Sequence, residues 1–222
     1  MANQAQAAQL QQLLNNGVAT LQLNLSDQQC NQLLFYLALL TKWNAVYNLT
    51  SVRDPVDMVR HHLLDALAAV PAFSRANTIL DVGSGGGVPG LVLAIAYPDK
   101  QLTLIDTVNK KTAFLTQVKT EMGLKNVVVY TGRVEQLKVV ELFDVITSRA
   151  FSDLANFIKW AGHLLAPGGQ MIALKGQLPE HEIERLPPGW EVKKIQPLRV
   201  PGLDAQRHLL WLERVSLCPS LS

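Results

Sequence analysis

Cysteine is scarce in this chain. Its 222 residues include only two, Cys30 and Cys218, which lie near opposite ends of the sequence and have no neighbours at metal-ligand spacing. We therefore expect a reduced protein that acts in the cytoplasm and binds no metal. A disulfide between the two cysteines is the less favoured alternative.

Long apolar segments are also missing. The longest uninterrupted apolar runs are Leu33–Leu40 and Leu91–Tyr97, whereas a helix that crosses a bilayer needs about 20 such residues. The start of the chain has neither the basic segment nor the small-residue cleavage site of a signal peptide. We therefore expect no membrane association.

Charge is sparse at the N-terminus and nearly balanced overall. Residues 1–41 contain a single charged side chain, Asp27, and the whole chain has a formal net charge of +2. This balance is too weak to indicate nucleic-acid binding by itself, but it allows a local basic face. The hydrophobic fraction of 48% is sufficient for a packed core and argues against a disordered chain.

The chain divides into two parts within one structural unit. Residues 1–72 contain only helical patterns, and we expect them to pack as an extension on the rest. Residues 73–217 alternate between apolar runs of strand length and helical segments. That alternation implies a mainly parallel sheet with helices on both faces.

The first part should contain several helices. One is predicted over 4–15 and ends near Gly17. A capping box formed by Ser26 and Gln29 starts the next helix, and Asp54 begins another with a proline in its first turn. The apolar side chains of the second helix that we expect to face inward are Leu33, Leu34, Leu37, Leu40 and Val46.

The second part supplies the strands. They are predicted over 78–82, 101–105, 126–130, 143–147, 169–174, 190–197 and 208–215, with a long helix over 152–165. The last two strands have no helix between them and should form an antiparallel hairpin. A Rossmann-like, seven-stranded, mainly parallel sheet whose last strand is antiparallel is the α/β architecture of class I S-adenosylmethionine-dependent methyltransferases.

A glycine-rich turn follows the first predicted strand. The segment reads Asp81-Val82-Gly83-Ser84-Gly85-Gly86-Gly87-Val88-Pro89-Gly90 and leads into a helix. Glycines let the backbone approach a ligand, and a helix N-terminus favours a carboxylate. In class I methyltransferases such a turn lies against the methionine part of the cofactor, with the acidic residue near its ammonium group. The candidate cofactor residues here are Asp81, Gly83, Gly85 and Gly87.

Two later strand ends complete the predicted cofactor site. Asp106 ends the second strand, where a carboxylate can accept two hydrogen bonds from a ribose diol. Val134 and Glu135 follow the third strand, where an adenine ring would lie. The alternatives are structural: Asp106 as a strand-end turn residue, and Glu135 as an exposed carboxylate at a helix start.

Motifs along nearly the whole chain match one family in order. They are Lys42-Trp43-Asn44-x-x-Tyr47-Asn48-Leu49-Thr50, His62-x-x-Asp65, Asp81-Val82-Gly83-x-Gly85-x-Gly87-x-Pro89-Gly90, Ser148-Arg149-Ala150, Leu174-Lys175-Gly176 and Arg207-His208-Leu209. The chain resembles the glucose-inhibited division protein B family, also called ribosomal RNA small-subunit methyltransferase G. The resemblance implies an enzyme that uses S-adenosylmethionine to methylate N7 of one guanine in bacterial small-subunit (16S) ribosomal RNA.

The resemblance also implies roles for individual residues. Gly83 and Val88 would line the cofactor site, and Val134 and Glu135 would meet the adenosine end. Arg149 would reach the junction of cofactor and substrate.

Methylation of guanine N7 needs little acid–base catalysis, because N7 has an available lone pair. Positioning of the base is therefore the main requirement, and Arg149 is the predicted positioning residue, through bidentate contacts to phosphate or guanine. A structural ion pair is the alternative for Arg149. His62 and Asp65 lie three residues apart on one helix face and are predicted to pair with each other.

Scattered cations would contact the RNA. Most lie at the ends of predicted elements, near the crevice at the carboxyl edge of the sheet, and together they predict a basic face. The alternative for each is a solvated surface charge. The candidates are Lys42, Arg53, Arg60, Lys110, Lys111, Arg133, Lys175 and Arg207. We expect a monomer whose substrate is the ribosomal RNA within the assembled subunit.

Two other functions stay open at this point. A nicotinamide-dependent oxidoreductase could use the same glycine turn, although the final hairpin and the lack of a catalytic Tyr–Lys or Cys–His pair argue against it. The other alternative is a non-catalytic module that keeps the cofactor turn and serves in ribosome assembly.

Overall fold

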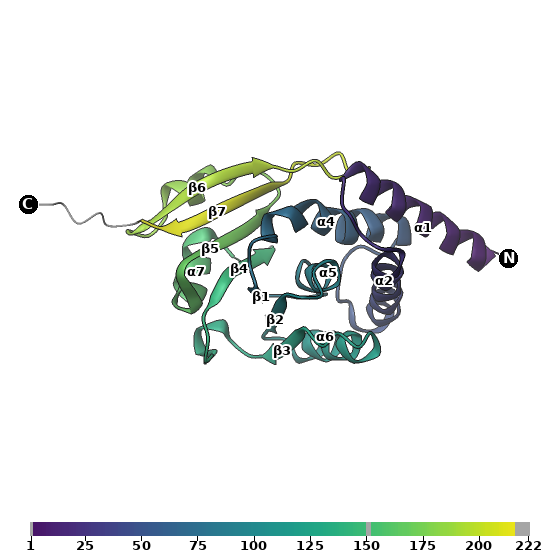
Figure 1. The fold of residues 1–222 in the computed structure, drawn as a ribbon, viewed down its shortest axis with the longest axis horizontal. Helices are drawn as coiled ribbons and strands as arrows, with labels where there is room; N and C mark the ends of the chain where they lie inside the picture. Colours follow the sequence, from purple (N-terminus) through teal and green to yellow (C-terminus); the bar gives the residue numbers. More distant parts are fainter. Residues whose placement is uncertain (1, 150–151, 216–222) are drawn as a thin grey trace, which may run out of the picture.

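Seven strands form one sheet in the computed structural model of the chain (Figure 1). Their order across the sheet is β3-β2-β1-β4-β5-β7-β6. The strands are β1 (Thr78–Val82), β2 (Gln101–Asp106), β3 (Val127–Thr131), β4 (Phe143–Arg149), β5 (Leu165–Lys175), β6 (Trp190–Pro197) and β7 (His208–Arg214). The structure describes residues 2–149 and 152–215. Cys218, and with it the disulfide alternative for Cys30, lies outside the described residues.

Strand directions confirm the predicted fold class. β1 pairs in parallel with β2 and β4, β2 pairs in parallel with β3, and β4 with β5. β7 is antiparallel to both β5 and β6 and lies between them. The carboxyl ends of the parallel strands therefore share one edge of the sheet, where folds of this kind place their ligands.

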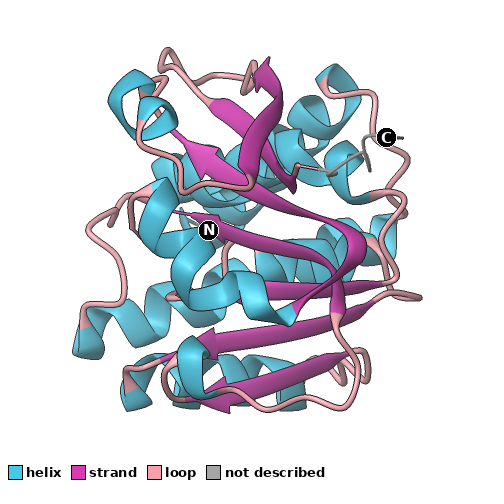
Figure 2. Cartoon of the chain, turned by 90° about the vertical axis from the view of Figure 1, so that its left-hand side faces the viewer, coloured by secondary structure: helices cyan, strands magenta, loops and turns pink. Residues whose placement is uncertain are grey.

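Helices cover both faces of the sheet (Figure 2). They are α1 (Ala2–Thr20), α2 (Asp27–Tyr47), α3 (Pro55–Met58), α4 (Asp65–Ala69), α5 (Gly90–Ala96), α6 (Asn109–Glu121), α7 (Leu154–Ala161) and α8 (Glu180–Glu184). Ile79 of β1 belongs to the core shared with α2, α5 and α6, whereas Leu80 belongs to the core shared with α7. Because successive side chains of a strand face opposite sides, a strand covered on both faces is apolar throughout. Within the described ranges, no helix is both long enough and apolar enough to span a membrane.

Helix α2 begins as predicted. The Oγ atom of Ser26 accepts a hydrogen bond from the backbone N–H of Gln29, and the Gln29 side chain accepts one from the backbone N–H of Ser26, which confirms the capping box. Val46 was expected to face inward, but it is 70% exposed. It lies two residues after the buried Asn44 and therefore on the opposite side of the helix.

Three predicted element ends are wrong, and one of them is the start of β5, which was predicted at residue 169 and lies at Leu165. Helix α1 continues past Gly17, because this glycine packs against Leu64: a Cβ atom at Gly17 would lie 2.3 Å from Cδ2 of Leu64. The helix predicted over 152–165 is shorter, because Leu165 already pairs with Phe143 as the first residue of β5.

One helical stretch changes type close to the carboxyl edge of the sheet. Asp54 caps α3 by accepting two backbone hydrogen bonds, and Pro55 lies in the first turn, as predicted. The next segment, Val59–Leu64 (η1), is π-helical and leads into α4. The backbone N–H of Asp65 donates to the carbonyl of Arg60 across this segment. Such π-helical turns often lie at functional sites.

Candidate functional site

Two cavities open at the carboxyl edge of the parallel strands. The glycine-turn cavity has a volume of about 540 Å³ and is lined by the glycine turn, the N-terminal part and the loop between β6 and β7. The strand-end cavity, of about 390 Å³, lies beside the ends of β2 and β3. Gly83 and Lys111 line both, so the two cavities meet at the turn. Both volumes fall within the range of about 300 to 1,000 Å³ typical of ligand sites.

The glycine turn connects β1 to α5, and the start of α5 packs closely against the sheet. Gly83 and Gly87 have positive φ angles, which residues with a Cβ atom rarely adopt. A Cβ atom at Gly90, where α5 begins, would lie 2.1 Å from Leu104 and 2.6 Å from Asp81. Glycine at this position therefore allows the helix to start against the sheet.

The predicted cofactor glycines have two different places in the turn. Gly83, Gly85 and Val88 line the glycine-turn cavity. Gly87 lines neither cavity and faces the core, where a Cβ atom would lie 2.4 Å from Cδ1 of Leu91. Gly87 thus supports the shape of the turn.

The turn is held from behind by the N-terminal part. The hydroxyl of Tyr36, on α2, donates a hydrogen bond of 2.6 Å to the carbonyl of Gly86. Tyr36 is fully buried, and burial raises the pKa of its hydroxyl, which therefore stays protonated as a donor. The sequence did not predict this contact, because Tyr36 is only one more apolar position in α2.

Asp81 lies behind the turn and lines neither cavity. Its Oδ2 atom accepts a hydrogen bond of 3.0 Å from the backbone N–H of Gly90, and its Oδ1 atom has no hydrogen-bond partner among the described residues. The carboxyl group is fully buried, and burial raises its pKa to about 7. Asp81 anchors α5 to β1 here, and its contact with a cofactor ammonium group stays a prediction.

Asp106 holds the other side of the turn. Its Oδ2 atom accepts a hydrogen bond from the backbone N–H of Gly85 at 3.0 Å, and its Oδ1 atom accepts one from Val108 at 2.9 Å. Nζ of Lys111 lies 3.7 Å from Oδ2. The carboxylate also lines the strand-end cavity. Because each carboxylate oxygen has a further lone pair, the structural role leaves Asp106 able to accept hydrogen bonds from a ribose.

The strand-end cavity combines apolar and charged walls. Val134 is buried, and Glu135 follows it in a short 3-10 turn after β3. Arg133 lies beside them, with its Nη1 atom 3.9 Å from Oε1 of Glu135. Trp160 of α7 also lines this cavity. The sequence analysis made no prediction for Trp160.

Three charged side chains form the polar wall of the glycine-turn cavity. Asp65 accepts a hydrogen bond of 3.1 Å from Nη1 of Arg149 at its Oδ2 atom and one of 2.7 Å from Nε of Arg207 at its Oδ1 atom. Arg149 also donates to the backbone carbonyl of His61 at 2.9 Å. All three side chains line the cavity.

The predicted pairing of His62 with Asp65 is wrong. Nε2 of His62 lies instead 3.0 Å from Oγ1 of Thr50, and both residues line the glycine-turn cavity. Burial, reinforced by nearby Arg149, lowers the pKa of His62 to about 4, so the ring is neutral at pH 7. A neutral imidazole is a weaker partner for a carboxylate than two guanidinium groups. Thr50, in the break after α2, is the last residue of one of the family motifs, but no role was predicted for it.

The cations predicted to contact RNA separate into two groups. Lys111, Lys175 and Arg207 line the glycine-turn cavity together with Arg149, the predicted positioning residue, although Lys175 is also ion-paired with Glu182 at 2.8 Å. Lys111 and Arg133 line the strand-end cavity. The remaining candidates line neither cavity, and they are Lys42, Arg53, Arg60 and Lys110.

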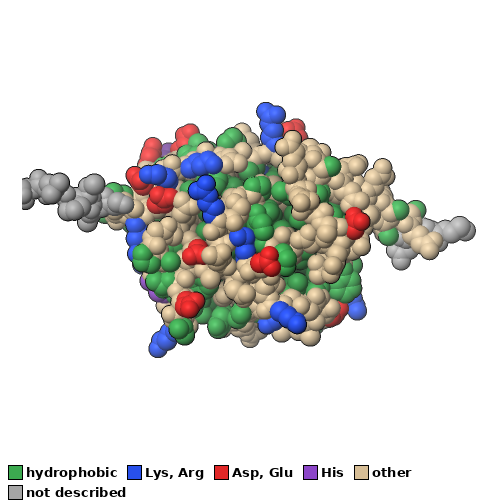
Figure 3. All heavy atoms as spheres, in the orientation of Figure 1, with side chains coloured by type: hydrophobic (Ala, Val, Ile, Leu, Met, Phe, Trp, Pro, Cys, Tyr) green, Lys and Arg blue, Asp and Glu red, His purple; other side chains and the backbone are tan. Residues whose placement is uncertain are grey.

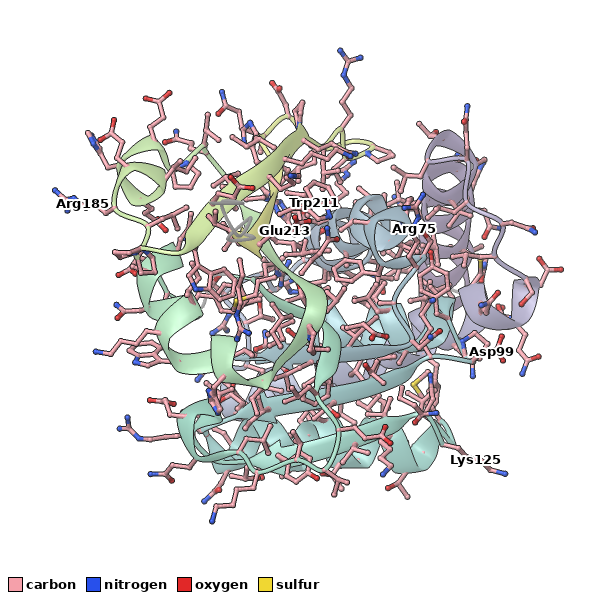
Figure 4. The ribbon with its side chains drawn as sticks, turned by 60° about the vertical axis from the view of Figure 1, so that its left-hand side comes forward. Arg75, Asp99, Lys125, Arg185, Trp211 and Glu213 are labelled. Atoms are coloured by element: carbon pink, nitrogen blue, oxygen red, sulfur yellow. The ribbon has the colours of Figure 1, made fainter. Side chains whose placement is uncertain are left out.

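Charged side chains away from the two cavities carry both signs. Figure 3 shows lysine and arginine side chains close together near β6, with acidic side chains beside them. Arg185, just after α8, and Lys125, just before β3, point away from the protein (Figure 4). In the part of the chain that the structure describes, no group of three or more His, Cys, Asp or Glu side chains could hold a metal ion.

Comparisons with known sequences agree on the class of protein. The family model described as rRNA small subunit methyltransferase G (GidB) matches residues 29–210. Ribosomal RNA small subunit methyltransferase G of Janthinobacterium sp. (strain Marseille) is 59% identical over 209 residues, which cover 92% of this chain and 95% of the relative. The protein of the same name from Herminiimonas arsenicoxydans is 58% identical over 206 residues, covering 91% and 94%.

Solved structures share the fold. The N-methyltransferase NodS from Bradyrhizobium japonicum WM9, solved with S-adenosyl-L-homocysteine, aligns with a TM-score of 0.56 at 15% identity and covers 79% of this chain and 99% of that one. TrmN from Thermus thermophilus aligns with a TM-score of 0.53 at 21% identity, covering 69% and 48%. The sequence relatives identify an rRNA methyltransferase and not an oxidoreductase. The chain belongs to the rRNA small subunit methyltransferase G family.

Proposed function

We propose that this chain transfers a methyl group from S-adenosylmethionine to N7 of a guanine in small-subunit (16S) ribosomal RNA. The observation that supports this most is the junction of the two cavities at Gly83 and Lys111. The cavity beside Asp106 suits a nucleoside, and the cavity beside Arg149 has room for an acceptor base. We further propose that the enzyme is a cytoplasmic monomer and that its substrate is the RNA of the assembled subunit.

The residues at the two cavities fit this cofactor. Asp106 would accept hydrogen bonds from the ribose, and Val134 and Glu135 would contact the adenine ring. The methionine part would lie against the backbone of Gly83 and Gly85, where no side chain intervenes. When bound, S-adenosylmethionine supplies an electrophilic methyl group carried by a sulfonium.

The chain would act by alignment. The bond from N7 to the methyl carbon forms as the carbon–sulfur bond breaks, so the guanine gains a positive charge and the sulfur becomes a neutral thioether. N7 carries no proton, so the reaction needs no general base, and holding N7 in line about 3 Å from the methyl carbon is the main requirement. Arg149 would orient the nucleotide through its phosphate or O6, while N7 stays open to attack.

The two parts of the chain would share this work. Residues 73–217 form the methyltransferase part that holds the cofactor, and residues 1–72 form the extension that contributes Thr50, His62 and Asp65 to the acceptor side. Cations that line the cavities, and others that lie outside them, would contact RNA phosphates. Those proposed for this role are Lys42, Arg53, Arg60, Lys110, Lys111, Arg133, Lys175 and Arg207.

The test uses small subunits purified from a bacterial strain that lacks this enzyme, together with labelled S-adenosylmethionine. We expect label in the ribosomal RNA at one guanine, detected as alkaline strand scission at N7-methylguanine. A parallel reaction with protein-free RNA should incorporate less label if the assembled subunit is the substrate. Label on protein or on an exocyclic amine would contradict the proposed reaction.

The Arg149→Ala variant separates catalysis from a role in assembly. We expect this variant to lose methyl transfer together with every biological effect of the chain. A variant that lost methyl transfer but kept those effects would favour the non-catalytic alternative.

A further inference from the structure

We propose that Asp65 is a positioning residue that fixes Arg149 and Arg207 so that both bind a phosphate next to the target guanine. The proposal rests on the proposed function, because it requires an RNA nucleotide to enter the glycine-turn cavity. It assigns the acceptor end of that cavity to three segments: the start of α4, the end of β4 and the loop before β7.

Burial distinguishes the carboxylate from the two guanidinium groups. The side chain of Asp65 is 5% exposed, whereas those of Arg149 and Arg207 are 25% and 24% exposed. Both carboxylate oxygens bond to arginine, at 3.1 Å and 2.7 Å. The protein therefore covers the acidic group and leaves the basic groups accessible from the cavity that they line.

Both arginines keep donors for a ligand. A guanidinium group has five N–H donors. The bonds of Arg149 to described residues use Nη1, and those of Arg207 use Nε and Nη1. Among these residues no hydrogen bond involves Nη2 of either arginine, so each can still donate to a phosphate oxygen.

The charge balance favours an anionic ligand. Asp65 is the only acidic side chain among the described residues that line this cavity, and one carboxylate neutralises only one of its two arginines. Lys111 and Lys175 have acidic partners of their own, Asp106 and Glu182. The remaining single positive charge suits one phosphodiester. Asp65 also limits the positive charge beside a guanine that becomes cationic on methylation.

The backbone before Asp65 is arranged for these contacts. The π-helical segment η1 ends at Leu64, and its His61 carbonyl accepts a hydrogen bond from Arg149. Because a π-helical turn contains one more residue than an α-helical turn, it rotates the following side chains by about 100°. The direction of Asp65 therefore depends on this irregular turn.

The first test compares Asp65→Asn with Asp54→Asn. Asparagine at 65 keeps the size of the side chain but cannot balance two guanidinium groups. We expect the catalytic efficiency with small subunits to fall on the order of 100-fold, mainly through a higher KM for the subunit, while the affinity for S-adenosylhomocysteine measured by calorimetry is retained. Asp54→Asn removes the same charge from an exposed helix cap that asparagine also fills, and it should leave catalytic efficiency unchanged.

A double-mutant cycle separates positioning from mere folding. Asp65→Asn should cause a smaller further loss in the Arg207→Ala background than in the wild type, because the contact with Arg207 is already gone and only the contact with Arg149 remains to be lost. Full additivity, or an Asp65→Asn enzyme as active as Asp54→Asn, would overturn the proposal. If Asp65→Asn fails to fold, Arg207→Lys serves instead: it keeps the charge but loses the Nε donor, and wild-type activity in this variant would overturn the proposal equally.

The proposed function and the role of Asp65 can fail separately. Absence of N7-methylguanine with the wild-type enzyme would refute the proposed function. Binding of small-subunit RNA to wild-type and Asp65→Asn protein, measured without cofactor, would still test the arginine pair. Equal affinities would then overturn the role of Asp65, and a weaker variant would support it.

Discussion

At the scale of single residues, burial changes the charge states of Asp81 and His62. Burial raises the pKa of Asp81 from 3.8 to about 7. Burial and Arg149 together lower the pKa of His62 from 6.5 to about 4. Both groups are therefore mostly uncharged near pH 6 in the folded protein, although each would be charged or partly charged in the unfolded chain.

These two groups should make opposite contributions to the pH dependence of stability. The unfolded chain loses the proton of Asp81 near pH 3.8 and the folded chain near pH 7, so this group lowers the free energy of unfolding as the pH rises through that window. The unfolded chain binds a proton at His62 below pH 6.5 and the folded chain only near pH 4, so this group raises the free energy of unfolding as the pH rises between those values.

Two variants separate the opposing contributions in urea denaturation. Asp81→Asn should remove the loss of stability that Asp81 causes as the pH rises. The free energy of unfolding of this variant, relative to that of the wild type, should therefore rise by roughly 1 to 4 kcal/mol between about pH 4 and pH 7. His62→Gln should remove the gain in stability that His62 causes between about pH 4 and pH 6.5. The free energy of unfolding of this variant should therefore fall more steeply with rising pH than that of the wild type. Identical pH profiles for the wild type and both variants would show that these pKa values are wrong.

Residue types were easier to predict than their partners. Gly83, Gly85, Val88 and Arg149, which were predicted to lie at one ligand site, all line the glycine-turn cavity, whereas Asp81 and Gly87 do not. The sequence paired Asp65 with the nearest candidate on its own helix, whereas its true partners lie 84 and 142 residues away. Only the fold brings such distant groups together, so local spacing could not identify them.

At the scale of elements, the start of α5 fixes how closely this helix approaches the sheet. We expect Gly90→Ala to lower the free energy of unfolding by roughly 1 to 3 kcal/mol, because the new methyl group would overlap Leu104 and Asp81. Thermal unfolding measures the effect. Gly176→Ala is the matched control, since its Cβ atom would lie 3.9 Å from the nearest neighbour, the carbonyl oxygen of Gln206. Similar stabilities for the two variants would contradict the close packing at Gly90.

Elements with strong local signals were predicted well. The capping box of α2 and the first strands needed only neighbouring residues to identify them. The helix and strand ends that were predicted wrongly depend on residues far away in the sequence. Gly17 packs against Leu64 within α1, and Leu165 pairs with Phe143 as part of β5. Tertiary contacts therefore decided the boundaries that the sequence could not.

At the scale of the whole molecule, the net charge of +2 does not show how charge is distributed between the two edges of the sheet. Lys110 follows β2 at the edge with the cavities, whereas Lys125 precedes β3 at the opposite edge (Figure 4). We expect Lys110→Ala to weaken RNA binding and to reduce the slope of log affinity against log salt by about 0.7 to 0.9. Lys125→Ala should change neither quantity. Filter binding over a salt series measures both, and equal slopes for the two variants would contradict a basic face at the cavities.

The overall architecture was predictable because alternation of strands and helices leaves few possible sheets. The antiparallel ending followed from the absence of a helix between 197 and 208. The position of β7 inside the sheet did not follow from the sequence, because β6 and β7 could pair with each other in either order at the edge.

That position has a consequence for how the protein is made. A ribosome synthesises β6 first, yet β6 reaches the sheet only through β7. Residues 190–197 therefore cannot join the sheet until residues 208–214 have left the exit tunnel of the ribosome. Arg207 directly precedes β7. A chain translated only as far as β6 therefore has the glycine turn but lacks one of the two arginines proposed to bind the RNA phosphate.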